Sequence, residues 1–228
     1  MSLFAISDLH LSLGASKPMD IFEEWHNYVE IIEKNWKNSV AENDCVVIAG
    51  DISWAMNLNE AEKDFKFIDS LPGEKIIIKG NHDFWWSSVR KISNFFKEKK
   101  INSIKVLQNL SLESQGFCIC GTRGWVCKSK SDRDKKIVHR EVERLRLSFK
   151  SSEKSELEKV VFMHYPPVYD KEENELMGVL VENNVNICYY GHVHGKHASG
   201  KAVVGKYRGV NLEFISCDYL GFKPRLVG

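Results

Sequence analysis

The feature that most constrains the fold is an alternation of short apolar runs and amphipathic stretches in the first third of the chain. The apolar runs lie within 3–6, 45–49 and 75–79, and each has a length typical of a buried strand. Between them, apolar residues recur at helical spacing over 20–39 and over 58–68. This order predicts parallel strands with helical crossovers, and therefore an α/β fold. In such folds, functional sites form beyond the carboxyl ends of the strands.

The rest of the chain continues the alternation. We expect a helix from Val89, short strands within 104–120, a charged helix at 132–149, strands at 160–163 and 186–190, and a hairpin at 201–218 that turns near Arg208-Gly209. The length of 228 residues predicts a single domain, 1–228, with a substrate-side insert at roughly 84–159. The polar segment Ser151–Lys159 is the best candidate for a linker.

The charge and cysteine content limit the possible partners and locations. A net charge of +1 indicates no general attraction to nucleic acid or anionic membranes. No apolar stretch is long enough to span a membrane, and the start of the chain does not resemble a signal peptide. The six cysteines form no CxxC pair, which favours reduced, buried thiols in a cytoplasmic protein. The oligomeric state is not predicted.

Five apolar runs end in residues that are able to bind metal ions. These residues are Asp8 and His10, Asp51, Asn81, His164, and His192 with His194. Carboxylate oxygens and imidazole nitrogens together are common ligands of transition metals. Alternate side chains of a strand share a face, so Asp8 and His10 can point the same way, and alternation puts His192 and His194 on one side. One such strand end is weak evidence, but five in succession predict a metal site.

These motifs, in the order Asp-x-His, Gly-Asp, Gly-Asn-His-Asp, a lone His and Gly-His-x-His, resemble the calcineurin-like metallophosphoesterase superfamily over residues 5–195. The resemblance implies a four-layer α/β/β/α sandwich with two central mixed sheets, two metal ions, and hydrolysis of phosphate esters. Carried over by motif, one metal is held by Asp8, His10 and His194, and the other by Asn81, His164 and His192, with Asp51 bridging both. His82 contacts the substrate phosphate or protonates the leaving oxygen, and Asp83 orients His82.

Elementary physics agrees with this assignment. Two cations about 3.5–4 Å apart repel each other, so a shared carboxylate at Asp51 is favourable. Such a pair can hold a bridging hydroxide that attacks phosphorus in line. His82 has no place among the metal ligands and is free for acid catalysis. Nitrogen and oxygen ligands suit divalent or trivalent Mn, Fe, Zn, Co or Ni, and the sequence does not choose among them.

Several functions remain open at this level. The leading prediction is a metal-dependent phosphohydrolase of a small-molecule or nucleotide phosphate ester, acting on monoesters or diesters. A nuclease or a pyrophosphatase of the same superfamily is an alternative, although no large basic extension supports a nucleic-acid substrate. A metal-binding interaction module that has lost catalysis is a third. For substrate binding we predict Arg123, in a glycine-flanked turn, together with Asn81 and His82.

Overall fold

The first of two sheets is built mainly from the first half of the chain. A computed structural model describes residues 1–126 and 131–228. The strands of the first sheet follow the order β13-β1-β2-β3-β4. They are β1 (Leu3–Ile6), β2 (Cys45–Ile48), β3 (Glu74–Ile77), β4 (Ile104–Val106) and β13 (Arg225–Leu226). Strands β1 to β4 are parallel, as the alternation predicts, and β13 pairs antiparallel with β1.

The second sheet is built from later residues in the order β11-β12-β10-β7-β6-β5. Its strands are β5 (Leu112–Ser114), β6 (Phe117–Thr122), β7 (Glu158–Met163), β10 (Ile187–Tyr190), β11 (Gly205–Tyr207) and β12 (Val210–Phe214). The four central strands are parallel and the two edge strands are antiparallel to their neighbours. Strands β8 (Val168–Tyr169) and β9 (Glu172–Glu173) form a separate pair. The predicted hairpin is present as β11 and β12.

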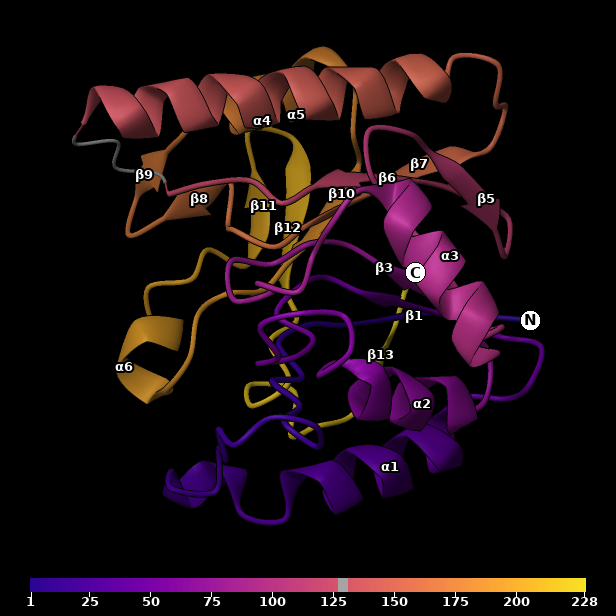
Figure 1. Cartoon of the computed structure of the whole chain (residues 1–228). Coiled ribbons are helices and arrows are strands. Elements are labelled where there is room, and N and C mark those ends of the chain that lie inside the picture. Colours follow the sequence, from indigo (N-terminus) through magenta and orange to yellow (C-terminus); the bar gives the residue numbers. More distant parts are fainter. Residues whose placement is uncertain (127–130) are drawn as a thin grey trace.

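Helices cover the outer faces of both sheets (Figure 1). The helices on the first sheet are α1 (Tyr28–Ser39), α2 (Glu62–Ser70) and α3 (Val89–Lys99), and those on the second are α4 (Asp132–Ser151) and α5 (Glu175–Glu182). A third apolar cluster fills the space between the sheets with residues from both, such as Val47, Ile76, Val160 and Phe162. This arrangement of helices outside two mixed sheets confirms the predicted sandwich.

The helix predicted at 20–39 begins later than expected. A 3-10 turn at Glu23–Trp25 precedes it, and Asn27, with a φ of 54°, separates the two. Trp25 is buried, with 4% of its surface exposed, but its ring lies 5.7 Å from the rings of both His10 and His194. The Trp25 ring also packs on Tyr28 and Phe222, each at 5.3 Å. Trp25 therefore fits the apolar pattern of the helix although it lies before α1 begins.

The segment between His82 and His164 contributes to both sheets. It supplies β4 to the first sheet and β5, β6 and β7 to the second, and 152–157 connects α4 to β7. Five of the six cysteines are buried free thiols, and Cys127 lies outside the described residues. A helix with the length and hydropathy to cross a membrane does not occur in the described parts of the chain.

Candidate metal centre

The predicted ligands gather where the carboxyl ends of β1, β2, β3, β7 and β10 meet. The loops that carry them hydrogen-bond to one another: the Asp8 N–H donates to the Gly50 carbonyl (2.9 Å) and the Gly191 N–H donates to the His164 carbonyl (3.0 Å). These bonds join the exits of β1 and β2, and those of β7 and β10. The structure therefore brings all seven predicted ligand residues to one rim of the sandwich.

Glycines allow these loops to approach closely. A Cβ on Gly80 would lie 2.1 Å from the Asp51 backbone nitrogen, and one on Gly50 would lie 2.7 Å from both Gly80 Cα and His164 Nδ1. Gly50 also has a φ of 93°, which other residues rarely adopt. The glycines of the Gly-Asp and Gly-Asn-His-Asp motifs are thus required by the packing of the loops.

One group of donors consists of Asp8, His10 and His194, whose ligand atoms lie within 4.8 Å of one another. His194 Nε2 is 3.2 Å from His10 Nε2 and 3.4 Å from Asp8 Oδ1. Asp8 is fully buried, and its Oδ2 accepts hydrogen bonds from Ser216 Oγ (2.8 Å) and the His192 N–H (2.9 Å). Its Oδ1 has no hydrogen-bond partner among the described residues. A buried oxygen in that situation is costly, and a cation at this position would satisfy it.

The second group consists of Asp51, His164 and His192. His164 Nε2 lies 3.3 Å from Asp51 Oδ2 and 2.7 Å from Asn81 Oδ1. The other ring nitrogen, Nδ1, donates to the Ala49 carbonyl at 3.1 Å, which leaves Nε2 free to act as a ligand. Asn81 adds a neutral oxygen to this group, as the motif predicts.

Asp51 lies between the two groups. Its Oδ2 is 3.3 Å from His164 Nε2 and 3.9 Å from His10 Nε2, and its Oδ1 accepts the His82 N–H at 2.7 Å. The side chain is 1% exposed. One buried carboxylate oxygen therefore faces donors of both groups, which is the position that a bridging ligand requires.

The electrostatics of the site favour bound positive charge. Burial lowers the pKa of His10 to about 4 and that of His192 to about 3, so these imidazoles are neutral at pH 7 and able to bind a metal. Burial also opposes the charging of His164, but Asp51 and Asp8 outweigh it and raise the pKa of His164 to about 9. The carboxylates thus create a strongly negative potential where the ligands converge.

The predicted alternation of side chains beyond the strands is wrong. Strand β1 ends at Ile6 and β10 at Tyr190, so the ligands that follow them lie in loops. Asp8 and His10 nevertheless face the same group, because both adopt positive φ angles, 63° and 45°. His192 and His194, by contrast, enter different groups.

The expected contact between Asp83 and the His82 ring is not formed. Both oxygens of Asp83, which is fully buried, accept other hydrogen bonds, and His82 Nδ1 has no partner among the described residues. Oδ1 accepts from the N–H groups of Ile52 (2.9 Å) and Ser53 (3.3 Å) and from Trp85 Nε1 (3.0 Å), and Oδ2 accepts from those of Asp51 (3.0 Å) and Gly80 (2.7 Å). Asp83 therefore fixes the loop that carries Asp51 against the loop that carries Asn81.

Trp54, which the sequence did not single out, contacts His82 instead. Its ring centroid lies 4.4 Å from that of His82, and it stacks on His10 at 4.8 Å. His82 is partly exposed at the rim of the site. Trp54 therefore limits the orientations of the one histidine of the motif that belongs to neither donor group. Its proximity to Asp51 in sequence was the available signal.

Asp218 and its neighbours are further site residues that sequence reasoning missed. Asp218 Oδ1 lies 3.1 Å from His194 Nδ1, and its Oδ2 accepts the Gly195 N–H at 3.1 Å. A carboxylate in this position orients a histidine so that its other nitrogen faces a metal. Ser216 holds Asp8, as described above, and Cys217 Sγ donates to the Asp8 carbonyl at 2.8 Å. These residues follow β12, a strand end without a histidine, so no ligand motif marked them.

Arg123 lies beside the centre and not among the ligand atoms. Its carbonyl accepts the N–H groups of His164 (3.2 Å) and Tyr165 (2.8 Å). Its guanidinium contacts the buried carboxylate of Glu141 at 3.3 Å and stacks on Trp125 at 4.7 Å. Arg123 thus joins β6 to α4, and a role in substrate binding stays a prediction.

Comparison with known proteins identifies the family. The sequence model of the calcineurin-like phosphoesterase family matches residues 1–196. The chain therefore belongs to the calcineurin-like phosphoesterase family, as its motifs predicted. It is also similar to MJ1445 of Methanocaldococcus jannaschii, an uncharacterized protein, with 30% identity over 95 residues. That match covers 40% of this chain and 51% of MJ1445, so it spans about half the length of the relative.

Solved structures share the fold. AQ665 from Aquifex aeolicus, a protein of unknown function, has a TM-score of 0.55 at 16% identity, with coverage of 99% of this chain and 95% of its own. The phosphopantetheinyl hydrolase PptH from Mycobacterium tuberculosis has a TM-score of 0.56 at 15% identity, with the same coverage. TT1561 of Thermus thermophilus has a TM-score of 0.58 at 11% identity and covers 99% of this chain and 97% of its own. These similarities concern the fold alone.

Proposed function

We propose that this protein hydrolyses phosphate mono- or diesters at a two-metal site. Family membership supports a metal-dependent phosphoesterase in general. The observation that favours two metals is the position of Asp51, whose single buried oxygen faces two separate groups of nitrogen and oxygen donors. A shared anionic ligand reduces the repulsion between two close cations.

The donor set suits the proposed ions. One group offers Asp8, His10 and His194, the other offers Asn81, His164 and His192, and Asp51 is common to both. Mixed imidazole and oxygen ligands suit Mn, Fe, Zn, Co or Ni. When bound, such a pair supplies an activated water as nucleophile and neutralises charge on the phosphate oxygens.

His82 is proposed as the general acid. Its side chain lies at the rim, where an ester's leaving group can approach, and it belongs to neither donor group. Burial lowers the pKa of His82, and Asp51 opposes that shift. A phosphate anion beside the ring would favour the protonated form further. His82 would then donate its proton to the leaving oxygen, while Trp54 limits the ring's movement and Asp83 keeps Asp51 in position.

Other readings of the site lead to different experiments. A nuclease or pyrophosphatase would use the same residues, and a panel of nucleic acids and diphosphates separates these from a phosphatase. A metal-binding module without catalysis would bind the ions but cleave no ester. A cytoplasmic location stays a prediction, supported by the buried free thiols.

The first prediction tests the bridging role of Asp51. Asp51→Asn keeps nearly the same shape but removes the negative charge, so the repulsion between two bound cations increases. We expect wild-type protein loaded with Mn²⁺ to hold two ions per chain and to cleave an aryl phosphate or its diester. The variant should bind fewer ions and lose nearly all activity.

The measurements are elemental analysis and initial rates on the same preparations. Asp132→Asn is the matched control, because it makes the same change of charge at an exposed position at the start of α4. A wild-type protein that is fully active with one ion per chain, or an Asp51→Asn variant that keeps both ions, would contradict the two-metal proposal.

A further inference from the structure

A polar cavity of about 330 Å³ lies next to the metal centre, where β3, β4 and β6 end. Its walls include Lys79, two residues before Asn81, and Arg123, whose carbonyl binds the backbone of His164. Arg144 and Glu141 of α4 close it on another side. The cavity shares the exit of β3 with Asn81, and Arg123 connects it to the backbone of His164. A group bound there would therefore lie beside a phosphate held at the centre.

The cavity has an excess of positive charge. Lys79, Arg123 and Arg144 face it, and Glu141 is the one carboxylate among its lining residues. Glu141 is fully buried, and its Oε1 contacts Arg144 Nη1 at 2.7 Å and Arg123 Nη2 at 3.3 Å. Its Oε2 accepts from Thr122 Oγ1 at 2.7 Å. Three cations against one anion leave a net charge of about +2.

Donors on these cations remain unused. Arg123 Nε is buried and has no hydrogen-bond partner among the described residues. Within the same parts of the chain, Lys79 forms neither an ion pair nor a side-chain hydrogen bond, although it is only partly exposed. Pairing with Glu141 accounts for the two arginines, but it leaves the positive charge of Lys79 beside them without a counterion in the part of the chain that the structure describes.

We propose that this cavity binds a second phosphoryl group of the substrate, so that the preferred substrates are bisphosphorylated. This inference rests on the proposed phosphoesterase function. A phosphate monoester carries a charge of about −1.5 to −2 at neutral pH, which matches the excess charge of the cavity. Guanidinium groups bind phosphate through paired hydrogen bonds, and Glu141 and the Trp125 ring hold these groups in fixed orientations. Ser87 and Gln108 add neutral polar groups to the lining.

The test compares matched substrates that differ by one phosphate. Initial rates of the Mn²⁺-loaded protein are measured on hexose 6-phosphate and hexose 1,6-bisphosphate, and on nucleoside 5′-monophosphate and 3′,5′-bisphosphate. We expect kcat/KM for at least one bisphosphate to exceed that for its monophosphate by about tenfold to hundredfold, the usual worth of one or two charge-assisted hydrogen bonds. A ratio near one for every pair would overturn the proposal.

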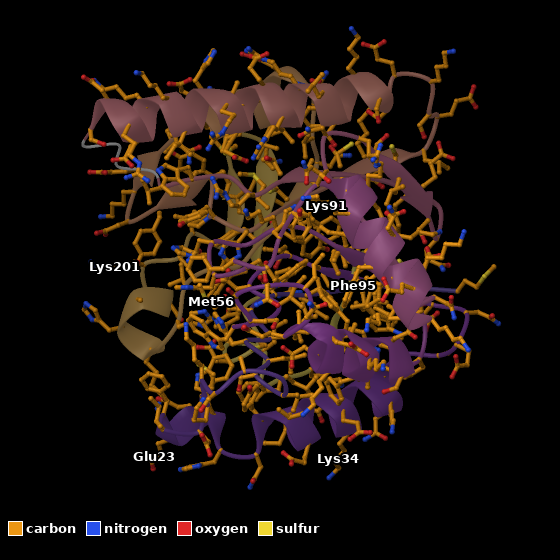
Figure 2. The ribbon with its side chains drawn as sticks, viewed as in Figure 1. Glu23, Lys34, Met56, Lys91, Phe95 and Lys201 are labelled. Atoms are coloured by element: carbon orange, nitrogen blue, oxygen red, sulfur yellow. The ribbon has the colours of Figure 1, made fainter. Side chains whose placement is uncertain are left out.

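Variants then assign the preference to the cavity. Lys79→Gln and Arg144→Gln should each reduce the ratio at least fivefold. The controls are Lys91→Gln, on the exposed surface of α3 (Figure 2), and Arg146→Gln, which is two residues from Arg144 and pairs with Glu143 at the surface. Both controls should keep the ratio. An equal loss on both members of a pair, with the ratio intact, would make Lys79 and Arg144 structural and overturn the subsite.

Failure of the proposed function gives a different result. In that case neither phenyl phosphate nor any member of the pairs is hydrolysed. Calorimetric titration of the wild type with the same compounds then still tests the cavity. Tighter binding of a bisphosphate than of its monophosphate, abolished by Arg144→Gln and kept by Arg146→Gln, would support the subsite, and equal binding would overturn it.

Discussion

Asp83 offers the most direct test of how the fold holds the metal ligands. Asp83→Asn preserves size and shape, but one carboxylate oxygen becomes an NH₂ group that cannot accept. In the wild type, Oδ1 accepts three hydrogen bonds and Oδ2 accepts two. The least costly orientation of the amide therefore leaves two buried N–H groups, those of Asp51 and Gly80, without an acceptor.

The magnitude follows from those two donors. An unsatisfied buried donor costs about 1–3 kcal/mol, so the variant should lose about 2–6 kcal/mol of unfolding free energy. That is a large part of the roughly 5–15 kcal/mol that stabilises a typical protein. In a chain of this size it corresponds to a fall in Tm of about 5–20 °C. One of the two donors belongs to Asp51 and the other to Gly80, the residue before Asn81. Losing their acceptor should disturb the loops that carry these two predicted ligands, so metal affinity should fall as well.

The assay is denaturant unfolding together with Mn²⁺ titration at pH 8. Burial and the nearby Asp51 raise the pKa of Asp83 to about 6, so the wild-type carboxylate is ionised at that pH. Asp44→Asn is the control, because Asp44 accepts one backbone N–H on each oxygen, from Ser2 (2.7 Å) and Ala41 (2.8 Å). It lies at the amino end of β2, away from the metal centre.

The control should lose about 1–3 kcal/mol, since one donor is left unsatisfied, and should bind Mn²⁺ like the wild type. An Asp83→Asn variant within 1 kcal/mol of the wild type would refute the hydrogen-bond argument. An equal fall in Mn²⁺ affinity in both variants would refute the specific link between Asp83 and the metal ligands.

Two further predictions concern single side chains at the rim. His82→Ala should keep its bound metals, and its kcat should fall about 10²–10⁴-fold for esters with poor leaving groups but less for good ones, which need no proton. An equal fall for both kinds of ester would assign His82 to positioning the phosphate. Asp218→Asn should weaken metal binding about 10–100-fold, because the amide no longer fixes His194 as a carboxylate does. Metal titration measures this, with Asp170→Asn as the control because it changes a surface carboxylate paired with Lys201. Unchanged metal affinity in Asp218→Asn would show that Asp218 does not orient His194 for metal binding.

Local pattern was sufficient to predict most strands and helices and the residues that gather at the candidate metal centre. Short apolar runs followed by glycine and ligand-type residues predicted both the strands and the positions where the site forms. The start of α1 was wrong because Trp25 is buried outside that helix, between Tyr28 and Phe222 on one side and His10 and His194 on the other. Burial of this kind produces the same apolar signal as burial on a helix face. Periodicity alone does not distinguish these two causes.

The function of Asp83 was not accessible from its neighbours in sequence. Next to His82, a carboxylate suggests a contact with the histidine ring. Its hydrogen-bond partners include residues 51–53, about thirty positions earlier in the chain, and those partners exist only once the exits of β2 and β3 lie side by side. Trp54 and Asp218 were missed for the same reason, since each acts through a contact between separate loops.

Backbone strain shows that the arrangement of the ligands depends on several loops and not on any one of them. Asp8, His10, Asp51 and His192 all have positive φ angles, between 45° and 75°. Such a conformation costs a residue with a side chain about 1–2 kcal/mol and persists only where the surroundings enforce it. Here the loops enforce it on one another: the His10 N–H donates to the Asp51 carbonyl, and the His192 N–H donates to Asp8 Oδ2, both at 2.9 Å. No strand continues through these residues, so strand alternation does not predict where their side chains point. The two donor groups form only when all the loops are in place.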